Sequence, residues 1–151
     1  MDVTVEDASI RTLDDLYEIE KQCFKQEAFS KQQIAWLLTD YNTVSLATKV
    51  NGALAGFVMG QVEEEQGRLV GHILTVDVAP EYRRLGVAER LLLEIEALFR
   101  QKGIEECRLE VREDNAAALS LYRKLGYVKV AKLEGYYKEA HGLYMVKMLR
   151  E

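Results

Sequence analysis

The chain has 151 residues, of which 48% are hydrophobic and 30% are charged, and its formal net charge is −5 at pH 7. These values are typical of one globular domain, which we expect to span residues 1–151. The acidic balance argues against a nucleic-acid partner, because such a partner needs a broad basic face. No apolar run approaches the roughly 18 residues of a membrane span, and the acidic N-terminus lacks the pattern of a signal peptide, so we expect no membrane partner.

The cysteines and histidines point to a reducing compartment and argue against a metal. Cys23 and Cys107 stand alone without CxxC spacing, so we expect two buried free thiols in a cytoplasmic protein. No spaced Cys/His cluster accompanies the two histidines, His72 and His141, so we expect no metal site. Composition leaves open whether the protein is a monomer or a homodimer.

The first half of the chain predicts four strands and two helices. Alternating apolar residues predict the strands, and Asn51-Gly52 is a strong signal for a two-residue hairpin. Apolar residues at helical spacing follow Thr12, and Ser30 with Gln33 forms a capping box that opens a second helix. The predicted strands span residues 2–8, 44–50, 53–62 and 68–79. We expect the acidic run at residues 63–67 to be a solvated turn.

The second half predicts two more helices and three more strands. Apolar positions from Val87 to Lys102 follow the helical period, with the pairs Arg90–Glu94 and Glu96–Arg100 on the outer face. Another helix, capped by Asp114 or Asn115, is expected to end at Gly126, and the predicted strands lie at 106–112, near 127–133 and at 142–149. The order β-α-α-β-β-β-α-β-α-β-β predicts an α/β (α+β) fold. It has a single mixed, mostly antiparallel seven-stranded sheet with helices on both faces.

The turn before the third helix predicts a phosphate site. The apolar strand ending at Val78 runs into Arg83-Arg84-Leu85-Gly86-Val87-Ala88, which opens the helix. A helix N-terminus carries partial positive charge and unpaired amides, so it binds phosphate groups well. Gly86 lets the backbone approach such a ligand closely, and the two arginines can add charged hydrogen bonds.

This turn resembles the Arg/Gln-x-x-Gly-x-Gly/Ala acetyl-CoA signature of the GNAT acetyltransferase superfamily. Three more segments, Leu109–Asn115, Ala116–Tyr127 and Gly135-Tyr136-Tyr137, look like those of the RimI-type and archaeal NatA-type protein N-terminal acetyltransferases. The similarity is close from about residue 68 to 149 and looser before that. It implies a GNAT fold and acetyl-CoA as co-substrate. The residues that it implies for binding acetyl-CoA are Val76, Asp77, Val78, Arg83, Arg84, Leu85, Gly86, Val87, Ala88, Glu89, Asn115 and Tyr122.

Two residues stand out for acid–base chemistry. By resemblance to the RimI type, Tyr122 is the general acid for the departing sulfur and Glu110 is the general base for the amine. Periodicity alone favours a core role for Tyr122, because Ala118, Leu121 and Leu125 complete an apolar stripe with it. Strand alternation alone makes Glu110 part of a solvated polar face.

Two other residues compete with Glu110 for the base. In relatives resembling the NatA type, a histidine at the position of His72 and a glutamate between the first two helices are implicated. His72 is therefore a candidate base or water-holding group, although a histidine on an apolar strand is commonly structural. Glu27 lies between the first two helices, but the segment 23–30 departs from the sequences of both types.

The resemblance and simple energetics favour an α-amine as acceptor. Forming the neutral amine at pH 7 costs about 1.4 kcal/mol for an α-amino group and about 4.6 kcal/mol for lysine. By resemblance, Tyr136, Tyr137 and Tyr144 line the peptide site, and Phe29 is the further substrate-binding candidate. The prediction is a protein N-alpha-acetyltransferase that acts on the N-terminus of a protein or nascent chain, and its substrates can include a ribosomal protein. The amine attacks acetyl-CoA directly in a ternary complex. The alternatives are a GNAT enzyme for a small amine or lysine, and a non-catalytic acyl-CoA-binding regulatory domain.

Overall fold

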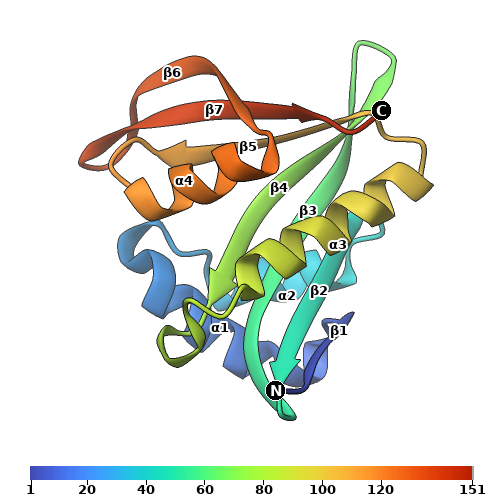
Figure 1. Cartoon of the computed structure of the whole chain (residues 1–151), viewed down its shortest axis with the longest axis vertical. Helices are drawn as coiled ribbons and strands as arrows, with labels where there is room; N and C mark the ends of the chain where they lie inside the picture. Colours follow the sequence, from blue (N-terminus) through green and yellow to red (C-terminus); the bar gives the residue numbers. More distant parts are fainter. Residues whose placement is uncertain (151) are drawn as a thin grey trace.

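Seven strands form one mixed sheet in the order β1-β2-β3-β4-β5-β7-β6 in the computed structural model, which describes residues 1–150 (Figure 1). The strands are β1 (Val3–Asp7), β2 (Thr43–Val50), β3 (Ala53–Glu65), β4 (Arg68–Val78), β5 (Glu106–Arg112), β6 (Val128–Tyr137) and β7 (Ala140–Met148). The helices are α1 (Leu13–Phe24), α2 (Lys31–Thr39), α3 (Val87–Gln101) and α4 (Ala116–Leu125). Short 3-10 turns lie at Ile10–Thr12, Lys25–Glu27 and Pro80–Tyr82. The predicted fold class and element order are confirmed, and the last residue of the predicted domain, Glu151, lies outside the described residues.

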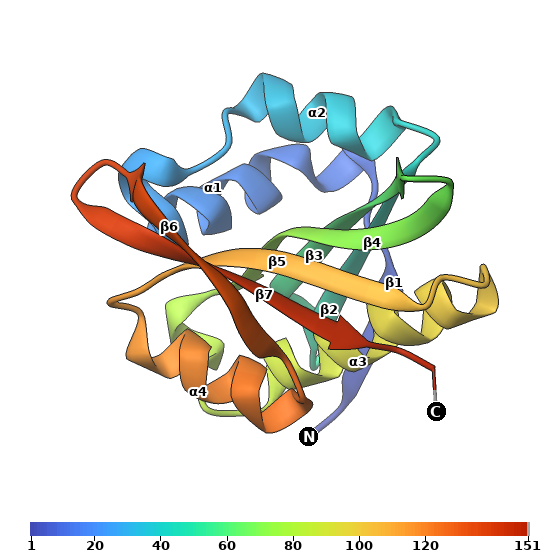
Figure 2. The same ribbon diagram turned by 90° about the horizontal axis from the view of Figure 1, so that it is seen from above.

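The sheet separates two hydrophobic layers. Helices α1 and α2 cover one face, and α3 and α4 cover the other (Figure 2). The larger layer packs α3 and α4 around Leu91, Ile95 and Phe99, which are fully buried. The smaller layer packs α1 and α2 around Leu16 and Ile34, also fully buried. No helix among residues 1–150 is long and apolar enough to span a membrane.

Local signals for the element ends are confirmed. Ser30 and Gln33 form the predicted capping box at the start of α2, and it stabilises that end by satisfying two backbone amides. Asn115, rather than Asp114, caps α4, and its side chain accepts a hydrogen bond from the amide of Ala118 at 3.1 Å. The predicted pair Arg90–Glu94 is present on the exposed face of α3 at 3.1 Å.

Two charged segments differ from the prediction. Residues 63–65 are not part of a solvated turn but continue β3, and the turn is confined to Gln66 and Gly67. Glu96 is fully buried instead of facing solvent. Its carboxylate accepts hydrogen bonds from the Tyr127 hydroxyl at 2.7 Å and from the Lys147 ammonium at 2.6 Å. These partners make the burial tolerable, because a buried charge must be paired.

The sheet opens between β4 and β5. These two strands run parallel, and their register holds at two pairs, Gly71 with Cys107 and His72 with Arg108. Beyond His72 the strands diverge, while β3 continues to pair with β4 as far as Val78. The diverging part of β4 therefore presents an edge inside the sheet, toward the start of α3 and toward α4 (Figure 1). Backbone groups on such an edge are available to another hydrogen-bonding chain.

Candidate active site

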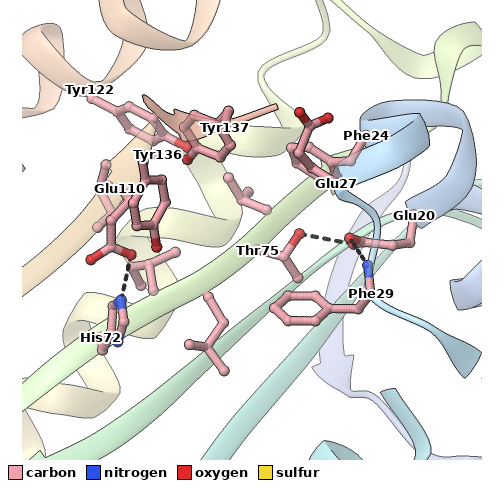
Figure 3. A pocket seen from close by; sticks show the side chains of 14 residues that line it. Glu20, Phe24, Glu27, Phe29, His72, Thr75, Glu110, Tyr122, Tyr136 and Tyr137 are labelled. Carbon is pink, nitrogen blue, oxygen red and sulfur yellow. Dashed lines mark hydrogen bonds and ion pairs between the residues drawn. The ribbon is translucent and has the colours of Figure 1, made fainter. Parts of the chain in front are cut away.

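A cavity of about 260 Å³ lies where β4 and β5 separate. Side chains enter it from α1 and the segment after it, from the middle of β4, from β5, from α4 and from the end of β6 (Figure 3). We call it the catalytic cavity. Its lining residues are Glu20, Phe24, Glu27, Phe29, His72, Ile73, Leu74, Thr75, Val76, Leu109, Glu110, Tyr122, Tyr136 and Tyr137.

A second cavity of about 570 Å³ adjoins the first and shares Phe24, Val76 and Tyr122 with it. It runs from the end of β4 to the start of α3 and along one side of α4, and we call it the cofactor groove. Its other lining residues are Val78, Tyr82, Arg83, Arg84, Gly86, Val87, Ala88, Glu89, Asn115, Ala117, Ala118 and Leu121. Most of the residues predicted for acetyl-CoA lie in this groove. The predicted Leu85 is not among the lining residues, and its side chain is 44% exposed.

The start of α3 has the geometry of an anion site. Gly86 is the N-cap residue with φ of 78°, so it provides no side-chain oxygen to cap the first amides of the helix. The first helical hydrogen bond runs from the Arg90 amide to the Gly86 carbonyl at 3.0 Å, which leaves the amides of residues 87–89 for another acceptor. A Cβ built on Gly86 meets nothing within 4 Å. The open space and the free donors fit a diphosphate.

Three charged side chains surround this turn. Arg84 has φ of 65° and is exposed beside the groove. Arg83 turns back to the end of β4, where its Nε lies 3.4 Å from the Val78 carbonyl. Glu89 forms an ion pair with Lys124 at 2.9 Å, which ties the start of α3 to α4 across the groove.

His72 is held between two carboxylates. Its Nε2 lies 2.7 Å from Glu110 Oε1, and its Nδ1 lies 2.9 Å from Glu63 Oε2. Burial alone would lower the pKa of His72, but the hydrogen bonds and charges of Glu110 and Glu63 outweigh it and raise the pKa. Two of the predicted base candidates, His72 and Glu110, are therefore one hydrogen-bonded pair at the cavity wall.

Tyr122 stands at the junction of the two cavities. It is 7% exposed, and its ring packs edge-on against Tyr127 at a centroid distance of 5.8 Å. Burial, followed by the nearby charges of Asp77 and Tyr137, raises the pKa of Tyr122. The phenol therefore keeps its proton at neutral pH and can serve as a hydrogen-bond donor.

Two tyrosines at the end of β6 cover the catalytic cavity (Figure 3). The rings of Tyr136 and Tyr137 are nearly perpendicular, at 86°, with centroids 4.9 Å apart. Arg112 lies 5.7 Å from the Tyr137 ring centroid and forms an ion pair with Glu27 at 2.7 Å. Because Glu27 is paired with a guanidinium, it is a weaker candidate base than Glu110.

The remaining predicted substrate residues lie in different places. Phe29 forms a wall of the catalytic cavity, as its position before α2 requires. Tyr144 pairs with Glu110 across β5 and β7, but it is not among the residues that line the cavity. Its hydroxyl lies 3.5 Å from Arg108.

Sequence reasoning missed a buried polar cluster under β4. The Thr75 hydroxyl lies 2.9 Å from Glu20 Oε1 and 2.6 Å from Asp77 Oδ1, and the Phe29 amide donates to Glu20 Oε2 at 3.0 Å. One hydroxyl hydrogen cannot serve two carboxylates, so one carboxyl of the pair carries a proton. Glu20 also accepts from the Phe29 amide, whereas the second oxygen of Asp77 has no hydrogen-bond partner among the described residues. Burial, and then Glu20, also raise the pKa of Asp77 well above its usual value, so we assign the proton to Asp77. The signal for Glu20 was its position four residues after Leu16, on the apolar face of α1.

Asp77 differs in this from its neighbours among the residues predicted for acetyl-CoA. Its side chain is fully buried in the polar cluster instead of lining the groove. The same described residues, 1–150, contain no cluster of three or more side chains that could hold a metal ion.

Comparison with known proteins identifies the family. Residues 12–127 match the sequence profile of the acetyltransferase (GNAT) family. The chain belongs to the GNAT family. It is 32% identical over 118 residues to an N-alpha-acetyltransferase of Sulfurisphaera tokodaii, which covers 72% of this chain and 71% of the relative.

Solved GNAT structures agree over the whole chain. Ard1 from Thermoplasma volcanium superposes with a TM-score of 0.89 at 27% identity and covers 100% of both chains. The ribosomal-protein-S18-alanine N-acetyltransferase from Escherichia coli has the same fold, with a TM-score of 0.88 at 24% identity over 99% of this chain and 96% of that one. The predicted family and the predicted activity of an acetyl-CoA-dependent acetyltransferase are confirmed.

Proposed function

We propose that this GNAT enzyme transfers acetyl from acetyl-CoA to the α-amino group at the N-terminus of a protein or nascent chain. The observation that carries the proposal is the junction of the cofactor groove with the catalytic cavity at Tyr122, in the same cavity as the Glu110–His72 pair. Relatives named N-alpha-acetyltransferase support the same acceptor.

Acetyl-CoA, when bound, supplies the acetyl group as an activated thioester. The amides of residues 87–89 and the side chain of Arg84 hold its diphosphate at the start of α3. The edge of β4 at Val76 and Val78, together with Asn115, lines the groove and holds the amide-rich arm. This arrangement aims the ligand along the groove toward Tyr122.

Glu110 accepts the proton of the acceptor amine. It lies at the wall of the catalytic cavity, where it is hydrogen-bonded to His72 and 21% exposed. Removing the proton from an α-ammonium group at pH 7 costs about 1.4 kcal/mol, which a carboxylate assisted by a histidine can supply. A lysine would require about 4.6 kcal/mol for the same step.

Tyr122 donates its phenol hydrogen to the departing sulfur. Direct attack by the amine is favoured over an acetyl-cysteine, because neither thiol suits a nucleophile. Burial raises the pKa of Cys107 to about 12, and a neutral thiol is a poor nucleophile. Cys23 does not line the catalytic cavity, and its sulfur lies 3.4 Å from the Val78 carbonyl, to which the thiol donates.

Phe29, Tyr136 and Tyr137 form the slot for the first residues of the substrate. They come from opposite sides of the catalytic cavity, the segment before α2 and the end of β6 (Figure 3). Tyr136 is 54% exposed, so it stands at the mouth of this slot. We also propose a cytoplasmic location, which the two free thiols, Cys23 and Cys107, support.

The test is acetyl-CoA turnover with pairs of peptides that differ only in a free or blocked N-terminus and that contain one internal lysine. We expect turnover with the free peptides and none with the blocked ones. Glu110→Gln should lower kcat by about 10²-fold at neutral pH. Equal turnover of blocked and free peptides would instead identify a lysine acetyltransferase. If only the free peptides react, a library varied at the first two residues defines the preferred N-terminus.

A further inference from the structure

We propose that Glu63 is a positioning residue for acetyl transfer, which holds His72 in the orientation and charge state that let it share the amine proton with Glu110. This inference rests on the proposed function, and nothing in the sequence pattern singled out Glu63. It depends on the extension of β3 through residues 63–65, which brings an acidic side chain next to the middle of β4.

Glu63 faces His72 because of the strand register. Gln61 pairs directly with His72 across β3 and β4, so Glu63, two residues further along β3, is the diagonal neighbour on the same face. Its Oε2 lies 2.9 Å from His72 Nδ1, on the side of the ring opposite Glu110. The imidazole is therefore fixed at both nitrogens.

Arg108 fixes Glu63 in turn. The guanidinium donates to Glu63 Oε1 at 2.6 Å and also pairs with Glu65, and its side chain is 14% exposed. Burial would raise the pKa of Glu63, but His72 and Arg108 outweigh it and lower the pKa. The ion pair with Arg108 thus keeps Glu63 ionised beside His72, whereas Glu110 is the carboxylate that lines the catalytic cavity.

The number of N–H hydrogens on the His72 ring decides which of the two carboxylates it can bond. A neutral imidazole has one N–H and one lone pair, so it can donate to only one of the two carboxylates. Because Arg108 keeps Glu63 ionised, the single hydrogen of neutral His72 stays on Nδ1. In that form the Nε2 lone pair faces Glu110 without a hydrogen bond, and the Nε2–Glu110 hydrogen bond forms when the pair takes up a proton. A second proton turns His72 into an imidazolium that donates to both carboxylates.

Proton transfer then follows a defined route. An N–H bond of the substrate ammonium breaks as an O–H bond forms on Glu110, and the amine keeps the electron pair with which it attacks. The proton passes from Glu110 to His72 Nε2, while Nδ1–H remains donated to Glu63. The result is a neutral amine, a Glu110 carboxylate and an imidazolium held between two carboxylates, which later loses its proton to solvent.

The charged and titratable groups around His72 come from four strands. Glu63 and Glu65 lie on β3, and Arg108 and Glu110 lie on β5. Tyr144 on β7 contacts Arg108, and Tyr136 on β6 lies close enough to Glu110 for the carboxylate to raise its pKa, after burial. Among these groups, Glu63 is the anion that contacts His72 without lining the catalytic cavity.

The test measures the pKa of His72 and the pH profile of turnover in Glu63→Gln. The imidazole pKa is read by NMR in the ligand-free enzyme, with His141 as an internal reference. We expect the pKa of His72 to fall by about one unit in Glu63→Gln. The rise of kcat/KM with pH should therefore occur at a lower pH than in the wild type, and kcat/KM should level off at a value several-fold lower. KM for acetyl-CoA should be unchanged, because Glu63 does not line the cofactor groove.

Glu64→Gln is the matched control, since it removes the same charge from the next, exposed residue of β3. It should leave both the pKa of His72 and the pH profile as in the wild type. Glu63→Asp keeps the charge and should lie closer to the wild type than Glu63→Gln does. Equal shifts in Glu63→Gln and Glu64→Gln, or an unchanged His72 pKa in a folded Glu63→Gln enzyme, would overturn the proposal. Because the NMR measurement needs no substrate, a failure of the proposed function with peptides is seen separately.

Discussion

Replacing Tyr122 by Phe removes one hydroxyl at the junction of the two cavities. Its ring packing against Tyr127 is kept, and the side chain is already 7% exposed. We therefore expect the free energy of unfolding to change by less than about 1 kcal/mol. Acetyl-CoA affinity should also be kept, because the start of α3 is not touched.

The size of the kinetic effect follows from the acidity of the phenol. A thiol ionises with a pKa near 8.5 and an ordinary phenol near 10, so full proton transfer to a thiolate is uphill by about 2 kcal/mol. Burial and nearby charge raise the pKa of Tyr122 further. Tyr122 therefore acts as a hydrogen-bond donor to the departing sulfur more than as a full acid, and its contribution falls at the lower end of the range of about 10² to 10⁴ for general acids.

The assay is the initial rate with a free N-terminal peptide, with kcat and both KM values determined from pH 6 to 9. We expect kcat to fall by about 10²-fold and both KM values to stay within about twofold. Tyr82→Phe is the matched control, because Tyr82 lines the far part of the cofactor groove and should keep its kcat. An unchanged kcat in Tyr122→Phe, or a loss of acetyl-CoA affinity with kcat intact, would make Tyr122 a packing residue.

Two further predictions test the groove and the buried polar cluster. Gly86→Ala places a Cβ in open space at φ of 78°, so the left-handed backbone alone should destabilise the fold by about 1–2 kcal/mol. We expect the free energy of acetyl-CoA binding, measured by calorimetry, to fall by more than this strain. A loss of binding free energy no larger than the loss of folding stability would contradict the phosphate site. Asp77→Asn should raise the unfolding temperature at pH 7. Because the pKa of Asp77 is raised in the folded protein, its contribution to stability is complete below the unfolded-state pKa of about 4 and is lost as pH rises through the folded-state pKa. Asparagine does not titrate and does not undergo this loss. The difference between Asp77→Asn and the wild type should shrink toward pH 4, and a gain independent of pH would contradict the assignment of the proton.

Local patterns were sufficient for the elements and for the phosphate turn. Apolar periodicity predicted the helices and most of the strand positions, since it reflects which face of a segment is buried, but it ended the third strand at residue 62 instead of at Glu65. The turn at Gly86 could be recognised because its donors come from adjacent residues of one strand–turn–helix unit. Family resemblance added Glu110 and Tyr122, which periodicity alone would have left as a polar face and a core residue.

Long-range register accounts for what the sequence did not reveal. Glu63 meets His72 and Arg108 only because β3, β4 and β5 pair in one alignment, with a bulge between Met59 and Gly60 that sets which side chains share a face. Glu96 could not be recognised as buried, because its partners Tyr127 and Lys147 are 31 and 51 residues away. A one-residue slip in a strand turns every side chain to the other face. The chemistry of each residue can therefore be read along the chain, but which charges meet in the catalytic cavity depends on how distant strands align.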